Sequence, residues 1–167
     1  LAAIAVARRF NVNVRAVRRA LLNFKPASMR LAPLMVNGIS FINDSYNSNP
    51  ASMEAALEAI SAYPARAKWI VSGDMLELGR GAVRLHRITG EHIAGSVVTG
   101  LLTLGKLSRH TLSGAYARGM ERKNLWHCAT HDEIADTLKR IIRPGDIVLI
   151  KGSRAMKMEK VIERMKG

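Results

Sequence analysis

The sequence predicts an α/β fold, and two observations carry this prediction. From Trp69 onward, four short apolar runs of strand type alternate with stretches of helical periodicity. Such alternation is typical of a mostly parallel sheet with right-handed crossovers. Before these units, Asn37-Gly38 separates two apolar runs, and this dipeptide is the strongest short signal for a two-residue β-hairpin. We therefore expect a Rossmann-like, mostly parallel sheet flanked by helices, with a β-hairpin at its start and a short N-terminal helical segment.

The first part of the chain is predicted to contain two helices, a linker and the hairpin. Residues 1–24 have the spacing of two short helices, with Asn13 as the N-cap of the second. Residues 24–30 contain a proline and small polar residues, which indicates a linker and a domain boundary. The hairpin strands are expected at residues 31–36 and 39–43, and a helix is expected to begin at Pro50.

The remaining elements alternate. Strands are expected at residues 68–72, 101–104, 124–128 and 146–150. Helices are expected at about residues 82–94, 108–117 and 132–142, with a last helix buried through Met158, Val161, Ile162 and Met165. Because the strands are parallel, the loops that follow them should meet at one edge of the sheet, where open α/β sheets bind ligands.

Composition indicates a soluble, cytoplasmic protein. Of 167 residues, 48% are hydrophobic, yet no apolar run approaches the roughly 20 residues that cross a bilayer, and no signal peptide is evident. A single cysteine, Cys128, is compatible with a reducing compartment. The net charge of +13 favours anionic partners. Aromatic residues make up only 5% and no nucleic-acid-binding motif occurs, so a solvated basic surface is favoured over nucleic-acid binding.

The polar turn at residues 43–49 is the first candidate site. Asn49 before Pro50 has the pattern of an N-cap followed by a first helical residue, so free backbone N–H groups and the positive helix end would face the turn. An anionic ligand would be favoured there. The alternative is an ordinary connection in which the Asn and Ser side chains only cap and turn.

Two further polar loops follow strands. Asp74 and Glu77 place two carboxylates after the strand at 68–72, where they could orient an amine or simply flank the next helix. Lys151 and Arg154 could form a cationic mouth for a carboxylate or phosphate, with Ser153 as a cap. The alternative is a capped helix with solvated charges.

Two other patterns are set aside. Gly100 to Lys106 matches the start of a Walker A motif, but Leu107 replaces the required Ser or Thr, and the residues between the glycines form the strand itself. His127, Cys128 and His131 lack a fourth ligand for a closed zinc site. No metal site is expected, and Cys128 is interpreted as a small buried hydrophobe.

Three strings carry a family resemblance. They are Asp-Ser-Tyr-Asn-Ser-Asn-Pro-Ala-Ser-Met from Asp44, Gly-Asp-Met-Leu-Glu-Leu-Gly from Gly73, and Lys-Gly-Ser-Arg-x-Met-x-Met-Glu from Lys151. Together they resemble the Mur ligases, in particular those that add D-alanyl-D-alanine to UDP-MurNAc-tripeptide in peptidoglycan synthesis. The resemblance covers residues 1–166. It implies that residues 1–29 are the helical end of a central ATPase domain with its linker, and that residues 30–167 are a Mur ligase C-terminal domain.

The resemblance also implies chemistry: ATP phosphorylates the tripeptide carboxylate, and the dipeptide amine attacks the acyl phosphate. ATP and Mg²⁺ would be bound mainly by the central domain, so this chain alone should be an inactive, monomeric fragment without catalytic or metal-binding residues of its own. Another Mur ligase, folylpolyglutamate synthetase, or a stand-alone basic module that binds phosphate or nucleic acid is the alternative. The implied nucleotide contacts are Arg30, Asp44, Tyr46, Asn47 and Asn49, and the implied dipeptide contacts are Asp74, Glu77, Lys151, Ser153 and Arg154.

Overall fold

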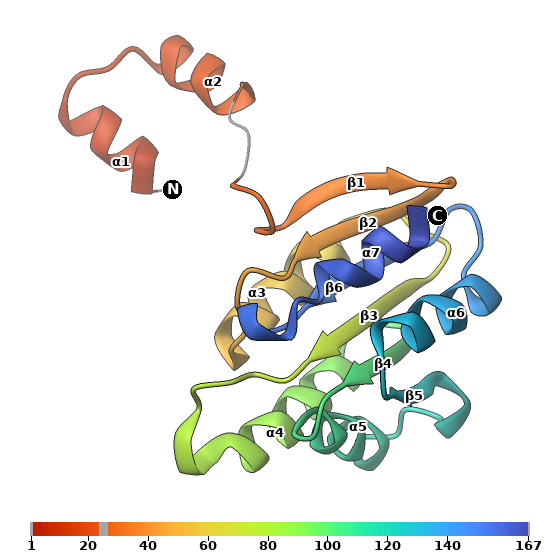
Figure 1. Ribbon diagram of the computed structural model, residues 1–167. Coiled ribbons are helices and arrows are strands. Elements are labelled where there is room, and N and C mark those ends of the chain that lie inside the picture. Colours follow the sequence, from red (N-terminus) through yellow and green to blue (C-terminus); the bar gives the residue numbers. More distant parts are fainter. Residues whose placement is uncertain (1, 24–26, 167) are drawn as a thin grey trace.

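The computed structural model describes residues 2–23 and 27–166, and the core of the predicted linker, residues 24–26, lies outside them. The described residues form a six-stranded sheet in the order β1-β2-β6-β3-β4-β5. β1 pairs antiparallel with β2, and the other neighbours are parallel. The predicted fold class is thus confirmed (Figure 1). The strands are β1 (Ala32–Val36), β2 (Ile39–Asp44), β3 (Lys68–Gly73), β4 (Gly100–Leu104), β5 (Leu125–Cys128) and β6 (Ile147–Lys151).

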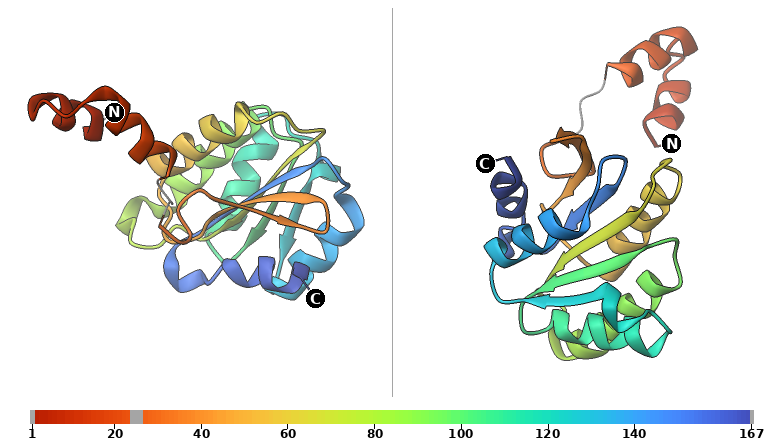
Figure 2. Two further views of the ribbon diagram at one scale, coloured as in Figure 1. Left: turned by 90° about the horizontal axis from the view of Figure 1, so that it is seen from above. Right: turned by 90° about the vertical axis from the view of Figure 1, so that its right-hand side faces the viewer.

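Helices cover both faces of the sheet, as the two separate apolar clusters and the views in Figures 1 and 2 show. One cluster joins α6 and α7 to strand residues such as Phe41 and Val71, and the other joins α3, α4 and α5 to Ile42 and Ile70. Neighbouring strand residues therefore point to opposite layers. The helices are α1 (Ala2–Arg9), α2 (Val14–Leu22), α3 (Pro50–Ser61), α4 (Ala82–Ala94), α5 (Ser108–Ala117), α6 (His131–Ile141) and α7 (Glu159–Lys166).

The hairpin is the predicted one. Asn37 and Gly38 have φ angles of +50° and +76°, and positive φ at both central residues defines a type I′ turn. This turn pairs β1 with β2 from Val36↔Ile39 to Ala32↔Asn43. The pairing fixes the course of β2, whose last residue is Asp44.

The last strand is shifted by one residue from its predicted position. β6 runs from Ile147 to Lys151 rather than from residue 146 to 150, so Lys151 is a strand residue with Asp44 and Ser72 beside it on the neighbouring strands. A 3-10 turn, η3 (Arg154–Met156), then precedes α7. Two other 3-10 turns, η1 (Gly79–Gly81) and η2 (Arg122–Asn124), were also not predicted.

Helices α4 and α5 pack at very short range through two glycines. A Cβ atom on Gly90 would lie 1.9 Å from the carbonyl oxygen of Thr111, and one on Gly114 would lie 1.9 Å from that of Arg87. Each glycine thus lies directly against the backbone of the other helix. This contact sets the position of the segment that follows β3, because η1 leads directly into α4.

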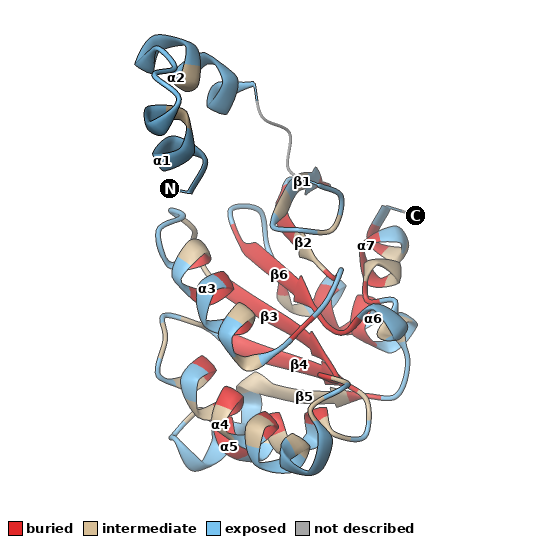
Figure 3. Cartoon of the chain, turned by 90° about the vertical axis from the view of Figure 1, so that its left-hand side faces the viewer, coloured by how far each residue is buried: buried red, intermediate tan, exposed pale blue. Residues whose placement is uncertain are grey.

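The two N-terminal helices are present as predicted and lie away from the sheet (Figures 1 and 2). The side chain of Asn13 accepts a hydrogen bond from the backbone N–H of Arg15 at 2.8 Å, which is the expected cap of α2. None of the described residues of α1 and α2 is buried, in contrast to the strands (Figure 3).

Candidate functional site

A cavity of about 320 Å³ lies at the carboxyl end of β2, beside the start of α3. It is the size of a small-ligand site. All five residues predicted to contact a nucleotide line it, so the structure brings that whole set together. Lys151, which the family resemblance assigns to the dipeptide contacts, lines the cavity as well. The lining residues are Arg30, Leu31, Asp44, Tyr46, Asn47, Asn49, Ser52, Ala55, Ala56 and Lys151.

Lys151 and Asp44 form the floor of this cavity. The Lys151 Nζ atom donates to Asp44 Oδ2 at 2.5 Å and to the backbone carbonyl of Asn47 at 3.2 Å. Only 1% of the lysine side chain and 14% of the aspartate side chain are exposed. The second carboxylate oxygen, Oδ1, accepts the backbone N–H of Leu31 at 3.0 Å. Asp44 thus connects β2, β6 and the start of β1.

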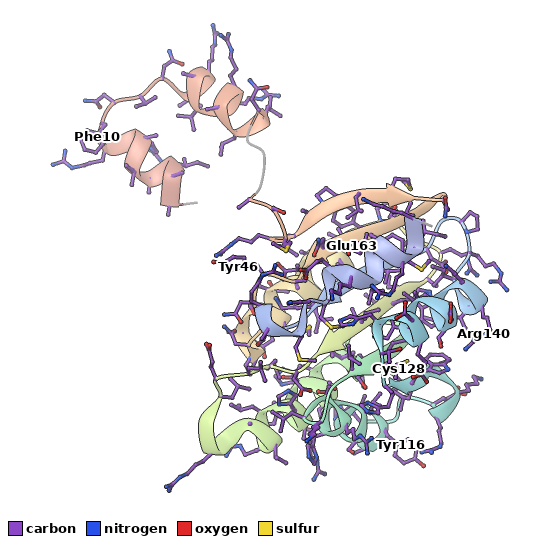
Figure 4. The ribbon with its side chains drawn as sticks, in the orientation of Figure 1. Phe10, Tyr46, Tyr116, Cys128, Arg140 and Glu163 are labelled. Carbon is purple, nitrogen blue, oxygen red and sulfur yellow. The ribbon has the colours of Figure 1, made fainter. Side chains whose placement is uncertain are left out.

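Arg30 and Tyr46 form the outer wall. The guanidinium carbon of Arg30 lies 4.2 Å from the centre of the Tyr46 ring, which is a cation–π contact. The backbone N–H of Tyr46 also donates to the carbonyl of Met29 at 3.1 Å. The segment before β1 therefore lies against the turn after β2, and Figure 4 shows Tyr46 on this outer side of the molecule.

The beginning of α3 opens onto the same cavity. Asn49 Oδ1 accepts the backbone N–H of Ser52 at 2.8 Å, and the Ser52 hydroxyl accepts the backbone N–H of Asn49 at 3.1 Å. This reciprocal capping box confirms the predicted N-cap. Residues that cap a helix at its positive end leave a favourable environment for anions.

The loop after β3 is held from three directions. Asp74 is nearly buried, and its Oδ1 accepts the backbone N–H of Ser108 at the start of α5 at 2.7 Å. Ser153 donates its backbone N–H to the Asp74 carbonyl, and its hydroxyl accepts the N–H of Leu76 at 2.8 Å. The predicted contacts Asp74 and Ser153 are therefore close together and already bonded within the loops that they hold.

His86 also holds the loop that follows β3. Its Nε2 accepts the backbone N–H of Met75 at 2.9 Å, so the ring proton is on Nδ1, which donates to the carbonyl of Ala82 at 2.7 Å. Burial lowers the pKa of His86, although the Ala82 hydrogen bond and Asp74 act in the opposite direction. The imidazole is thus a neutral structural group that joins α4 to the loop after β3.

Glu77 and Arg154 are exposed, and the structure does not bring Arg154 together with Lys151. Arg154 instead pairs with Glu159 at 2.5 Å. Burial opposes ionisation of Glu159, but the hydrogen bond and charge of Arg154, a backbone hydrogen bond and the Ser45 hydroxyl together outweigh it and keep the pKa of Glu159 below its usual value. The predicted cationic mouth is therefore divided, because Lys151 is buried against Asp44 and Arg154 pairs with Glu159 at the start of α7.

Sequence reasoning missed a second group of residues at the carboxyl ends of β4 and β5. Arg109 donates its Nε–H to His127 Nε2 at 3.0 Å, and His127 Nδ1 lies 3.0 Å from Thr103 Oγ1. Arg109 and His127 border a cavity of about 460 Å³ together with Lys106. The sequence does contain a signal for this group. Lys106 and Arg109 closely follow the buried strand β4, so they lie at the same edge of the sheet as the other candidate residues.

The described residues include no group of three His, Cys, Asp or Glu side chains that could hold a metal ion. The residues present also do not fit Mg²⁺, since Asp44 already binds Lys151 and a backbone N–H. Burial raises the pKa of the Cys128 thiol to about 11, so the thiol stays protonated, and Figure 4 shows it inside the fold. Within the described residues, no helix is long and apolar enough to span a bilayer.

A larger cavity, about 740 Å³, lies elsewhere, between α3 and the end of α4. Glu54, Glu58 and Glu91 line it. These carboxylates would repel a phosphate, so the cavity at the end of β2 remains the better candidate for an anionic ligand.

Comparison with known proteins identifies relatives of this arrangement. Residues 29–154 match the family described as "Mur ligase, glutamate ligase domain". The chain is 32% identical over 167 residues to the UDP-N-acetylmuramoyl-tripeptide–D-alanyl-D-alanine ligase of Bacillus subtilis, covering 98% of this chain and 36% of the relative. It is 31% identical to the Escherichia coli ligase of the same name, over 99% of this chain and 35% of the relative.

Solved structures show the same similarity. The MurF ligase of Thermotoga maritima in complex with ADP is 25% identical and superposes with a TM-score of 0.81 over 98% of this chain and 36% of that chain. A MurF structure from Acinetobacter baumannii, 27% identical, has a TM-score of 0.84 over 99% of this chain and 36% of that one. The chain thus spans about 36% of the length of the relatives that it matches.

Proposed function

The chain belongs to the Mur ligase family, through its glutamate ligase domain, and from this premise we propose that it is the C-terminal part of an ATP-dependent ligase that adds D-alanyl-D-alanine to UDP-MurNAc-tripeptide. In this proposal residues 30–167 form the C-terminal domain, and residues 1–29 are the end of the preceding ATPase domain with its linker. The protein acts in the cytoplasm as a monomer.

One observation carries the nucleotide part of the proposal. The five residues that the family resemblance marks as nucleotide contacts come from two segments, Arg30 before β1 and residues 44–49 from the end of β2 onward, and all of them line the same cavity. Arg30 lies over the Tyr46 ring, so an arriving purine would find an aromatic face and a cation in the same place. ADP is bound in the related Thermotoga maritima structure.

The proposed chemistry has two steps. The γ-phosphoryl group of ATP passes to the tripeptide carboxylate and gives an acyl phosphate. The dipeptide amine then attacks the acyl carbon, and the tetrahedral intermediate expels phosphate to leave an amide. The described residues contribute binding: the cavity holds part of the nucleotide, and the loops after β3 and β6 hold the amine substrate near it. Mg²⁺, when bound by the rest of the enzyme, would offset phosphate charge.

A chimaeric enzyme tests the proposal. The C-terminal third of the Bacillus subtilis ligase is replaced by this chain, and phosphate release is measured with ATP, the tripeptide substrate and the dipeptide. We expect release only when all three are present, and none from this chain alone. Release that is independent of the dipeptide, or ligation by the isolated chain, would contradict the proposal.

A further inference from the structure

The cavity at the carboxyl ends of β4 and β5 has a cationic lining. It measures about 460 Å³, and none of the described residues that line it is acidic. Lys106, Arg109, His127 and His131 supply its polar groups. An uncompensated set of this kind attracts an anion.

Arg109 is held in place by an ordered chain of hydrogen bonds. Its Nε–H donates to His127 Nε2 at 3.0 Å, so the imidazole proton is on Nδ1 and donates to Thr103 Oγ1, also at 3.0 Å. The Thr103 hydroxyl in turn donates to the Trp126 carbonyl at 3.4 Å. Thr103 is fully buried, and it lies opposite His127 in the pairing of β4 with β5.

This chain of bonds leaves the arginine charged and free to bind. Burial and the neighbouring guanidinium lower the pKa of His127, so the group that holds Arg109 is neutral. In the described part of the chain, no partner engages the two terminal nitrogens of Arg109. A guanidinium fixed through Nε presents these nitrogens side by side, which is the geometry that binds a carboxylate with two parallel hydrogen bonds.

Two carboxylates act electrostatically on His127, but neither lines the cavity or pairs with Arg109 or Lys106 in the described residues. Asp74 binds the backbone N–H of Ser108, and Glu133 accepts the backbone N–H of Ala129. The exposed Lys106 adds a second cation at the rim, with no ion pair in the described structure. His131 donates its Nε2–H to the Met156 carbonyl at 2.9 Å and so attaches the opposite wall of the cavity to η3.

We propose that Arg109 and Lys106 bind the free carboxylate of the dipeptide substrate in this cavity, and that His127 and Thr103 are positioning residues for Arg109. The inference rests on the proposed ligase function and names the carboxylate subsite within it. It assigns that role to the ends of β4 and β5 instead of Lys151 and Arg154, whose charges are paired with Asp44 and Glu159.

The spacing of the strands supports this placement. β2 and β4 are three strand positions apart in the sheet, which corresponds to roughly 14 Å. An extended dipeptide spans roughly 7 Å. With its carboxylate at Arg109, its amine would therefore lie over the loops that follow β3 and β6, on the way to the nucleotide cavity. Those loops are the ones that Ser153 joins to Asp74 and Leu76.

The test is an NMR titration of the full 167-residue chain with D-alanyl-D-alanine, its C-terminal amide and acetate. The Arg109 Nε–H and His127 ring resonances report on the site. We expect both to shift with the dipeptide, and the amide to bind about tenfold more weakly or worse, because it cannot accept charge-assisted hydrogen bonds at both oxygens. No shift with millimolar dipeptide, equal binding of the amide, or equal binding of acetate would each overturn the proposal.

Three variants separate binding from positioning. Arg109→Gln should abolish the difference between dipeptide and amide. Thr103→Val should weaken dipeptide binding severalfold while the amide is unaffected, and the His127 Nδ1–H resonance should move. Arg122→Gln, an equal charge change on an exposed residue outside the cavity, should change nothing. An equal loss of dipeptide affinity in Arg109→Gln and Arg122→Gln would mean that the dipeptide is attracted by the general positive charge, and it would overturn the proposed site.

Kinetics of the chimaeric enzyme then identify the source of the carboxylate. Arg109→Gln should raise the KM for the dipeptide at least tenfold and leave the KM values for ATP and the tripeptide substrate unchanged. A rise in the tripeptide KM instead would assign the carboxylate to the other substrate and overturn the proposal. If the chimaera does not ligate at all, the proposed function fails, while the NMR titration still decides whether the cavity binds a dipeptide carboxylate.

Discussion

Lys151 and Asp44 end two neighbouring parallel strands and meet in a nearly buried ion pair, with Nζ 2.5 Å from Oδ2. The pair joins strands that are more than a hundred residues apart in the sequence. Its two members differ in burial, since only 1% of the lysine side chain but 14% of the aspartate side chain is exposed. This difference makes the consequences of removing each partner unequal.

Asp44→Asn should destabilise the protein more than Lys151→Met. The first change leaves a buried ammonium group without its counter-charge, and such a loss costs about 3 to 5 kcal/mol of the free energy of unfolding. The second leaves a partly solvated carboxylate that keeps its hydrogen bond from Leu31, so its cost should be smaller. Urea denaturation of both single variants and the double variant measures the coupling. Equal losses in the free energy of unfolding of the two single variants would contradict this difference between the partners.

Gly90→Ala and Gly114→Ala should each destabilise the α4–α5 contact strongly. The added methyl group would lie 1.9 Å from a carbonyl oxygen of the other helix, so the helices must separate, at a cost of about 3 kcal/mol or more. Gly81→Ala is the matched control, because its Cβ would meet only a Leu85 side chain at 3.6 Å. Urea denaturation of the three variants should place the control near the wild type. A stable Gly90→Ala protein would contradict the close packing.

Stability should fall as the pH drops below about 7, and His86 should account for part of this fall. Burial lowers the pKa of His86 in the folded state, so the unfolded chain binds a proton at a pH where the folded chain does not. The contribution of His86 is therefore complete above the unfolded pKa and is lost as the pH falls through it toward the folded value.

The comparison is between the wild type and His86→Gln, which offers an acceptor to Met75 without titrating. The free energy of unfolding of the variant should depend less steeply on pH between about 7.5 and 5. His127 also has a lowered pKa, so a His127→Gln variant serves as the parallel measurement. Identical slopes for wild type and His86→Gln would rule out this role of His86.

Tyr46→Ala should weaken nucleotide binding, while Tyr46→Phe should not. Stacking of a base on an aromatic ring contributes about 1 to 3 kcal/mol, which corresponds to a loss of roughly fivefold to a hundredfold in affinity. Tyr63 is the control, since it is also 45% exposed but lies outside this cavity. Calorimetric titration of ADP into each variant measures the effect. Equal weakening by Tyr63→Ala would show that the ring of Tyr46 has no special part.

Much of the fold could be predicted because its signals are local. Asn37-Gly38 dictates the hairpin through backbone sterics, and Asn49-Pro50 marks the start of α3 by capping chemistry. The position of each loop after a strand placed the candidate residues at one edge of the sheet. The gathering of Arg30, Asp44 and Tyr46 into one cavity follows from that position.

The pairing of side chains could not be predicted, because it depends on which strands are neighbours. Lys151 meets Asp44 only because β6 enters the sheet beside β2 and extends one residue further than its apolar run suggests. Arg109 meets His127 only through the packing of α5 against the end of β5, and Thr103 is matched to His127 by strand register. Spacing along the chain contains none of this information.

The position of β6 between β2 and β3 has a consequence for the order in which the protein can assemble during synthesis. The ribosome makes this strand last of the six, yet it is the strand that joins the hairpin to the rest of the sheet. Until residue 151 has emerged, β2 and β3 each have an open edge without its final partner. The β1–β2 hairpin and the unit of β3, β4 and β5 therefore remain separate until β6 inserts between them. Only then does Lys151 reach Asp44 and complete the floor of the nucleotide cavity.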